Sequence, residues 1–171
     1  MKQFAYRAAK AALATAVAAM MTAAPAIAGG QSCLNPKEER ADKIRFVQTQ
    51  FMVAALQCRH SHTKALAEFY NGFVTNHRAE FTDNYRTLSG FLKRDGRTTI
   101  DSYLVAQANL ISLGSWEVAD FCGEMLKVAS LEGGSAREAL PLLDLMPVSY
   151  QRIGKACPAT AVASATTPTG R

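Results

Sequence analysis

The chain has 171 residues, of which 19 are Lys or Arg and 14 are Asp or Glu, so its formal net charge is +5. Three of the basic residues and none of the acidic ones lie in residues 1–28, which leaves 16 against 14, a net charge of +2, in the remainder. A balance so close to neutral argues against the concentrated basic face of a nucleic-acid-binding protein, and we expect no nucleic-acid partner.

Residues 1–28 have the pattern of a cleavable secretory signal peptide. The first ten residues carry three basic side chains and no acidic one, and an uncharged, Ala-rich run follows. Ala26 and Ala28 supply the small residues that signal peptidase requires at positions −3 and −1. A membrane anchor is the disfavoured alternative, because the run ends at Pro25 and lacks about 20 strongly apolar residues. We therefore expect a bacterial periplasmic or secreted protein that begins near Gly29, with no membrane span after cleavage.

The exported part is expected to hold one helical domain over residues 29–157. Residues 158–171 are mostly Ala, Thr, Pro, Ser and Gly, which predicts a disordered tail. No proline occurs between Lys37 and Leu140, and a stretch of that length without proline favours helices.

The first helix has the clearest signals at its start. Asn35 can cap it, Pro36 suits its first position, and Glu38 completes a capping box. Apolar residues then recur at steps of three and four from Ile44 to Cys58, which predicts one buried stripe.

Three further helical stretches follow. The stretch 64–94 is either one helix or two with a break near Asn76–His77, and periodicity leaves both open. A third helix is expected over 98–114 and a fourth over 115–133, capped by Ser115. Two prolines keep the segment after it short or kinked.

These elements predict an all-α fold, an antiparallel bundle of about four main helices with a short C-terminal helical segment. Four cysteines in an exported chain indicate two disulfides. The first helix ends near Cys58, at the end of the bundle where the fourth helix begins and carries Cys122. We therefore favour Cys58–Cys122 and, at the opposite end, Cys33–Cys157, with the two other possible connectivities left open.

Four short segments resemble a group of small exported bacterial proteins of unassigned function. The resemblance covers roughly residues 33–125, and it implies an exported helical domain with structural cysteines. It carries over no catalytic or binding residue. The segments are Phe51–Cys58, Tyr70–Val74, Ala108–Ser112 and Phe121–Cys122.

Three conspicuous residues are expected to be structural. Asn71 and Asn109 lie on helices that otherwise read as buried, where an asparagine usually satisfies a backbone group or another side chain. Trp116 follows the expected cap at Ser115, and we expect it to pack at a helix end.

The segment from Cys58 to His62 is the most suggestive of metal chemistry. His60 and His62 can share copper or zinc if the backbone between them is extended. On a helix they would point about 200° apart and could not chelate together. Because a stable site needs three or four fixed ligands, a polar turn between helices is the favoured interpretation, and we assign no metal and no cofactor.

Motifs for catalysis are absent from the sequence. Ser61 and Lys64 match the Ser-x-x-Lys pattern of penicillin-binding enzymes, but the partner motifs are missing. No serine-hydrolase elbow, zinc-protease motif or phosphate loop occurs, so no catalytic residue is assigned.

The sequence thus favours an exported, non-enzymatic helical module that binds a macromolecular partner or a small ligand in the cell envelope. One alternative is a metal-binding or redox-related periplasmic protein that uses residues 58–62. Another is a small hydrolase with no recognisable motif. The partner and the oligomeric state are not predicted.

Overall fold

The structure is a computed structural model of the whole chain, and it describes residues 33–58, 63–96, 98–131 and 138–158. These ranges contain the helices α1 (Pro36–Gln57), α2 (Thr63–Asn76), α3 (Arg78–Asp95), α4 (Ile100–Gly114) and α5 (Phe121–Leu131), and the 3₁₀ helices η2 (Ser115–Glu117) and η3 (Leu140–Leu145). No strand occurs in the described ranges, so the expected all-α class is confirmed.

Two expectations concern residues outside the described ranges, namely the signal peptide over 1–28 and nearly all of the tail over 158–171. Among the residues that the structure does describe, none of the helices combines the length and the apolar character needed to cross a membrane.

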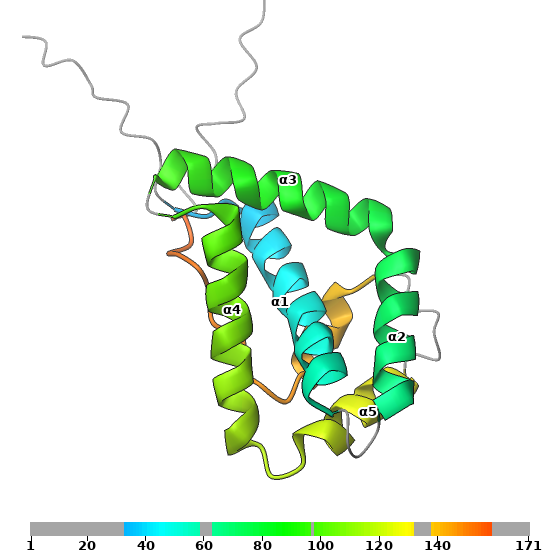
Figure 1. Cartoon of the computed structure of the whole chain (residues 1–171). Helices are drawn as coiled ribbons and strands as arrows, with labels where there is room; N and C mark the ends of the chain where they lie inside the picture. The colour runs from blue at the N-terminus through cyan, green and yellow to red at the C-terminus, as the bar shows by residue number, and fades with distance from the viewer. Residues whose placement is uncertain (1–32, 59–62, 97, 132–137, 159–171) are drawn as a thin grey trace, which may run out of the picture.

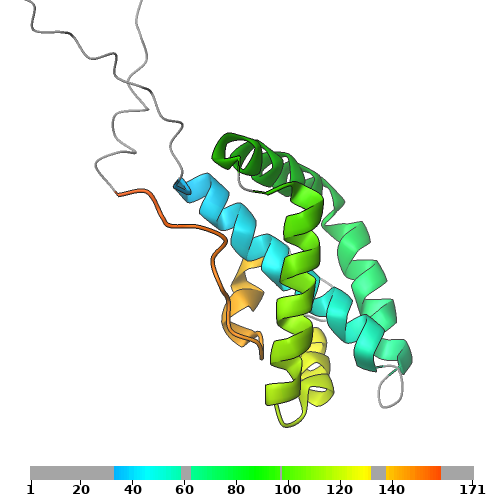
Figure 2. The ribbon, with the colours of Figure 1, turned by 60° about the vertical axis from the view of Figure 1, so that its left-hand side comes forward.

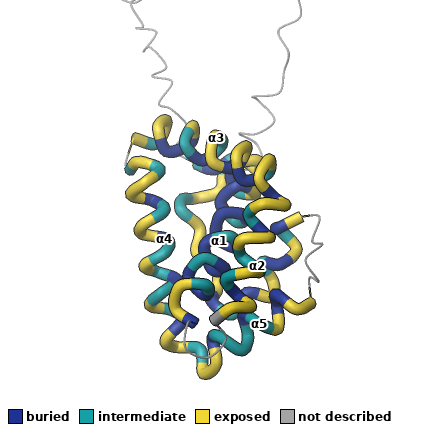
Figure 3. The backbone as a smooth tube through the Cα atoms, turned by 45° about the vertical axis from the view of Figure 1, so that its right-hand side comes forward, coloured by how far each residue is buried: buried dark blue, intermediate teal, exposed yellow. Residues whose placement is uncertain are grey.

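Helix α1 is the centre of the fold. It contacts α2, α3, α4, α5 and η3, and it lies between α2 and α4 in Figure 1. Its expected capping box is confirmed: the Glu38 amide donates to Asn35 Oδ1 at 3.0 Å, and the Asn35 amide donates to Glu38 Oε2 at 2.9 Å. Figure 3 shows α1 mostly in the buried colour, while α3 presents exposed residues on its outer side.

The stretch 64–94 is two helices, and the break falls at His77. This residue is buried, and its ring centroid lies 4.7 Å from that of Phe73 and 5.7 Å from that of Phe81. Its Nδ1 lies 3.0 Å from a carboxylate oxygen of Glu80. The packed imidazole fixes a turn, after which α3 crosses the ends of α1 and α4 (Figure 1).

Helix α3 crosses the bundle between α2 and α4, so the direction of α4 relative to α1 has to be read from their contacts. Contacts between α1 and α4 advance together along both helices: Asp42 with Tyr103, Thr49 with Gln107, and Gln57 with Ser112. Helix α4 therefore runs parallel to α1.

The predicted start of the fourth long helix is wrong. Residues Ser115–Glu117 form η2, and α5 begins only at Phe121. The Ser115 hydroxyl donates to the Ser112 carbonyl at 2.7 Å and to Gln57 Oε1 at 3.0 Å, so it ties α4 to α1 rather than capping α5. Asp120 accepts the Gly123 amide at 3.0 Å instead.

The favoured cysteine pairing agrees with the structure. Cys58 is bonded to Cys122, and Cys33 is bonded to Cys157 at the other end of α1. Beside the Cys33–Cys157 disulfide, the Leu34 amide donates to the Lys155 carbonyl at 2.8 Å. The C-terminal segment after η3 runs back along α1 to reach this point (Figure 2).

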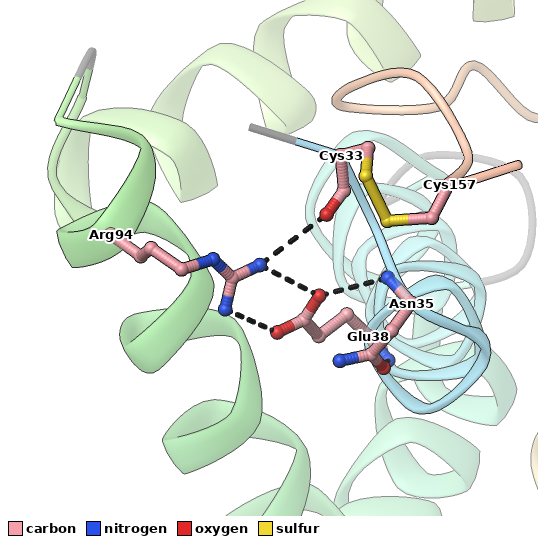
Figure 4. A network of polar contacts seen from close by, with 5 residues as sticks. All are labelled: Cys33, Asn35, Glu38, Arg94 and Cys157. Carbon is pink, nitrogen blue, oxygen red and sulfur yellow. Dashed lines mark hydrogen bonds and ion pairs between the residues drawn. A yellow bond between two sulfur atoms is a disulfide. The ribbon is translucent and has the colours of Figure 1, made fainter. Parts of the chain in front are cut away.

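An ion pair joins the start of α1 to the end of α3 (Figure 4). Arg94 Nη1 and Nη2 donate to the two carboxylate oxygens of Glu38 at 2.8 and 3.0 Å. Arg94 Nη2 also donates to the Cys33 carbonyl at 3.3 Å. Glu38 thus caps α1 and holds α3, while Gly96, with φ of 70°, ends α3 in the left-handed conformation that glycine tolerates.

Three residues expected to have structural roles are exposed to solvent. Asn71 and Asn109 are exposed, and Trp116 is 84% exposed. The helix faces that carry them point to solvent, so these residues satisfy no buried group.

Candidate functional site

Three charged residues of α1 are buried, which is rare for charged side chains, and only Glu38 among them is held in a bidentate ion pair, with Arg94. The other two are Asp42 and Arg45. Asp42 is 0% exposed and Arg45 is 8% exposed. Each organises a polar cluster, and the two clusters differ in whether a ligand could reach them.

The cluster around Asp42 is closed by internal hydrogen bonds. Tyr103 donates to Asp42 Oδ1 at 2.5 Å, and Tyr150 donates to Oδ2 at 2.5 Å. The Ile153 amide also donates to Oδ2, at 3.0 Å. Gln107 Nε2 donates to the Tyr103 oxygen at 2.6 Å. One carboxylate therefore joins α1, α4 and the C-terminal segment.

Burial dominates the ionisation of this cluster. Burial raises the pKa of Asp42 above its ordinary 3.8 by more than the hydrogen bonds from Tyr103 and Tyr150 lower it. Burial, together with the neighbouring Asp42 carboxylate, also raises the pKa of both tyrosines. Both tyrosine hydroxyls therefore stay protonated and keep donating hydrogen bonds to Asp42, as expected for a cluster that stabilises the fold.

The same segment is fixed again about two turns further along α1. Gln50 Nε2 donates to the Val148 carbonyl at 2.8 Å, and the Val148 amide donates to Gln50 Oε1 at 3.2 Å. A Cβ on Gly114 would lie 2.8 Å from Val148 Cγ1, so any side chain at this position would force Val148 to shift. The Asp42 side of α1 is thus sealed.

The cluster around Arg45 faces α3. Its Nε donates to Asn84 Oδ1 at 2.8 Å, its Nη1 to Gln48 Oε1 at 2.5 Å, and its Nη2 to the Phe81 carbonyl at 3.1 Å. Asn84 is held in turn by a hydrogen bond from its Nδ2 to the Ala41 carbonyl. All three acceptors of the guanidinium are neutral, and they engage three of its five N–H groups.

No carboxylate in the described part of the chain forms an ion pair with Arg45. Burial lowers the pKa of Arg45 from its ordinary value, but an arginine side chain stays charged in proteins. A buried charge without a countercharge is unfavourable, since neutral hydrogen bonds replace hydration only in part. This guanidinium would therefore be stabilised by an anion.

Arg45 forms part of the wall of an open hollow between α2 and α3. The hollow has a volume of about 460 Å³. Its other lining residues are Val74, Arg78, Phe81, Thr82, Tyr85 and Arg86. Three arginines thus surround one space that contains no carboxylate among its lining residues.

A second hollow of about 600 Å³ adjoins the first. The two share Arg78, Thr82 and Arg86, and the second adds Thr75, Asn76 and Ala79. The shared residues are spaced four apart on α3, so they form one exposed ridge about 12 Å long. We call the two hollows and this ridge the arginine groove.

Helix α3 separates its charges by face. Glu80 and Asp83 lie on the side away from the groove, where Glu80 lies 3.7 Å from an Arg40 nitrogen and Asp83 lies 3.5 Å from Lys37 Nζ. In the described residues, neither Arg78 nor Arg86 has an ion-pair partner. The positive potential over the groove is therefore not cancelled by its own helix.

The structure describes only part of the segment proposed for metal and acyl chemistry. His60, His62 and Ser61 lie outside the described residues. Cys58 is held in a disulfide, and Lys64 is exposed and lies 3.6 Å from Glu68. The described ranges contain no group of three or more His, Cys, Asp or Glu side chains that could hold a metal ion.

Sequence reasoning missed the arginine groove, although part of its signal is present. Arg45 falls within the buried stripe of the first helix, where a charged residue is unexpected. Arg78 and Arg86 lie eight residues apart on one helix face, with no acid between them on that face. The approach of α1 to α3 at this point is a tertiary feature that the pattern does not contain.

Fold and site together define an all-α, disulfide-linked domain with a groove lined by three arginines. Comparisons of the chain with known protein families, curated proteins and solved structures find no match.

Proposed function

We propose that this chain is an exported, non-enzymatic helical binding module and that its arginine groove binds a small anion in the cell envelope. The observation that carries the proposal is the buried guanidinium of Arg45, which has neutral acceptors only and lines a hollow ringed by Arg78 and Arg86. Oxyanions are the natural guests, because a guanidinium presents a fork of donors that matches a phosphate, sulfate or carboxylate group.

Arg45 gives the site rigidity as well as charge. Its three internal hydrogen bonds hold it in one orientation before a ligand arrives. Preorganised donors lose little conformational entropy on binding, so they contribute more to affinity than mobile ones. Arg78 and Arg86 are exposed and can adjust to the ligand, which divides the groove into a fixed and a mobile part.

Support for the two alternative functions is weaker. A redox or thiolate role for Cys58 would require that its disulfide with Cys122 open. A hydrolase needs a nucleophile within reach of a base, and the buried pair His77–Glu80 has its imidazole packed between Phe73 and Phe81.

Calorimetric titration of the disulfide-bonded exported protein with inorganic phosphate and with sulfate tests the proposal. We expect saturable binding at low salt, where exposed charges are little screened. Arg78→Gln and Arg86→Gln should each weaken it about fivefold to tenfold, because each removes a charge-assisted contact.

The matched control is Lys93→Gln, which removes one positive charge from the exposed surface of the same helix without touching the groove. It should leave the affinity within about twofold. Equal losses in all three variants would mean that only net charge attracts the anion, and the absence of saturable binding to the unmodified protein would refute the proposal.

A further inference from the structure

The arginine groove is larger than a simple ion requires. Its two hollows have volumes of about 460 and 600 Å³, within the range of about 300–1,000 Å³ that is typical of sites for organic ligands. A phosphate or sulfate ion on the ridge would leave most of this space unfilled.

The two hollows differ in chemistry on either side of the shared ridge. The first is lined by apolar surface from Val74, Phe81 and Tyr85. Tyr85 is 43% exposed, so its ring forms an accessible wall rather than part of the core. In the second hollow, Thr75 and Asn76 line the wall next to the shared ridge, where the first hollow has Val74, Phe81 and Tyr85.

Apolar surface next to arginines suits a particular kind of anion. The ring of Tyr85 can pack against an aromatic or alkyl group, and tyrosine contributes such contacts at a low entropic price because it has few rotatable bonds. The oxyanion of the same ligand would then lie in the first hollow, between Arg45 and the ridge arginines Arg78 and Arg86.

We propose that the ligand is an amphiphilic organic anion, with a phosphate or similar oxyanion in the first hollow between Arg45 and the ridge arginines Arg78 and Arg86, and an apolar group against Val74, Phe81 and Tyr85. This inference rests on the proposed anion-binding function and adds the class of ligand. The second hollow, beyond the ridge, leaves room for a further substituent, to which Thr75 and Asn76 can offer polar contacts.

Three soluble probes with the same anionic group test this class. They are inorganic phosphate, glycerol 3-phosphate and 1-naphthyl phosphate, titrated calorimetrically into the disulfide-bonded protein. We expect 1-naphthyl phosphate to bind at least about tenfold more tightly than the other two, a factor that requires only about 60 Å² of apolar surface to leave water.

Tyr85→Ser is expected to weaken 1-naphthyl phosphate about fivefold and to leave inorganic phosphate unchanged. Trp116→Ser is the matched control, because it removes an exposed aromatic side chain that does not line the groove. Circular dichroism verifies that both variants are folded.

The outcomes separate this inference from the function on which it rests. If all three probes bind equally and Tyr85→Ser changes none of them, anion binding stands and the amphiphilic class is wrong. If no probe binds, both fail. If 1-naphthyl phosphate binds but Arg78→Gln and Arg86→Gln do not weaken it, the site is elsewhere and the inference is overturned.

A free molecule and a lipid can both present this chemistry. Co-sedimentation with vesicles that contain phosphatidylglycerol distinguishes them, provided that 1-naphthyl phosphate binds as expected. Sedimentation that is lost in the Arg78→Gln/Arg86→Gln variant identifies a lipid source, and no sedimentation identifies a soluble one; both support the amphiphilic ligand.

Discussion

Replacement of Asp42 by alanine is expected to destabilise the fold by about 3–5 kcal/mol. The substitution leaves three donors without their acceptor: the buried hydroxyl of Tyr103, and the partly buried hydroxyl of Tyr150 and amide of Ile153. Chemical denaturation followed by circular dichroism measures the free energy of unfolding. Since total stabilities are about 5–15 kcal/mol, such a loss would bring the domain close to unfolding.

The surface variant Asp83→Ala is the control, because Asp83 is exposed and its contact with Lys37 is a single ion pair between exposed side chains. It should change stability by no more than about 0.5 kcal/mol. A comparable loss in both variants would show that the Asp42 cluster does not hold the C-terminal segment as described.

The effect of Asp42 also has a defined pH dependence. Its pKa is raised in the folded state above the ordinary 3.8, so the native protein holds this proton more tightly than the unfolded chain does. The resulting stabilisation is fully present below pH 3.8 and is lost as pH rises through the native pKa. The difference in stability between the unmodified protein and Asp42→Ala should therefore be largest in acid.

Removal of the Cys33–Cys157 disulfide by serine substitution at both positions is expected to destabilise the protein by about 4 kcal/mol. The bond closes a loop with a sequence separation of 124, and most of its effect lies in restricting the unfolded chain. The same denaturation measurement gives the free energy of unfolding of this variant. It is compared, under one set of conditions, with a variant that lacks the Cys58–Cys122 disulfide.

The second disulfide provides an internal comparison. Cys58–Cys122 spans 64 positions, and because the entropy depends on the logarithm of loop length, its removal should cost only about 0.6 kcal/mol less. A loss below about 1 kcal/mol for the Cys33–Cys157 variant would mean that Asp42 and Gln50 alone fix the C-terminal segment.

The features that sequence predicted well depend on local signals. Asn35, Pro36 and Glu38 lie within one helical turn, so their capping box could be recognised without a fold. The cysteine pairing followed from the order of the helices and from which ends they share, which short connections largely determine.

The features that sequence did not predict depend on contacts between distant residues. Periodicity left open whether 64–94 is one helix or two, because the break at His77 is made by packing between Phe73 and Phe81, and each of these residues is compatible with a helix. Ser115 reads as a helix cap, but its hydroxyl is used by Gln57, 58 positions earlier in the chain. Local patterns do not contain either preference.

The candidate site was missed for a related reason. Arginines spaced along an exposed helix usually form a solvated face. Here Arg45 is hydrogen-bonded to Asn84 and Phe81 of the same helix, and this contact is what suggests a binding site. That contact depends on how α3 crosses α1 after the break at His77. Because the sequence leaves that break open, it does not reveal the groove.

The central claim is that Arg45, Arg78 and Arg86 together hold an anion, and nuclear magnetic resonance of the arginine Nε–Hε groups tests it most directly. Arg94 and Arg152 serve as controls within the same spectrum, because they are already paired with Glu38 and Glu39. On titration with phosphate, we predict saturable shifts for the three groove arginines with one common dissociation constant, and no shift for the two controls. Uniform small shifts of all five, or a signal of Arg45 that does not move, would contradict the account.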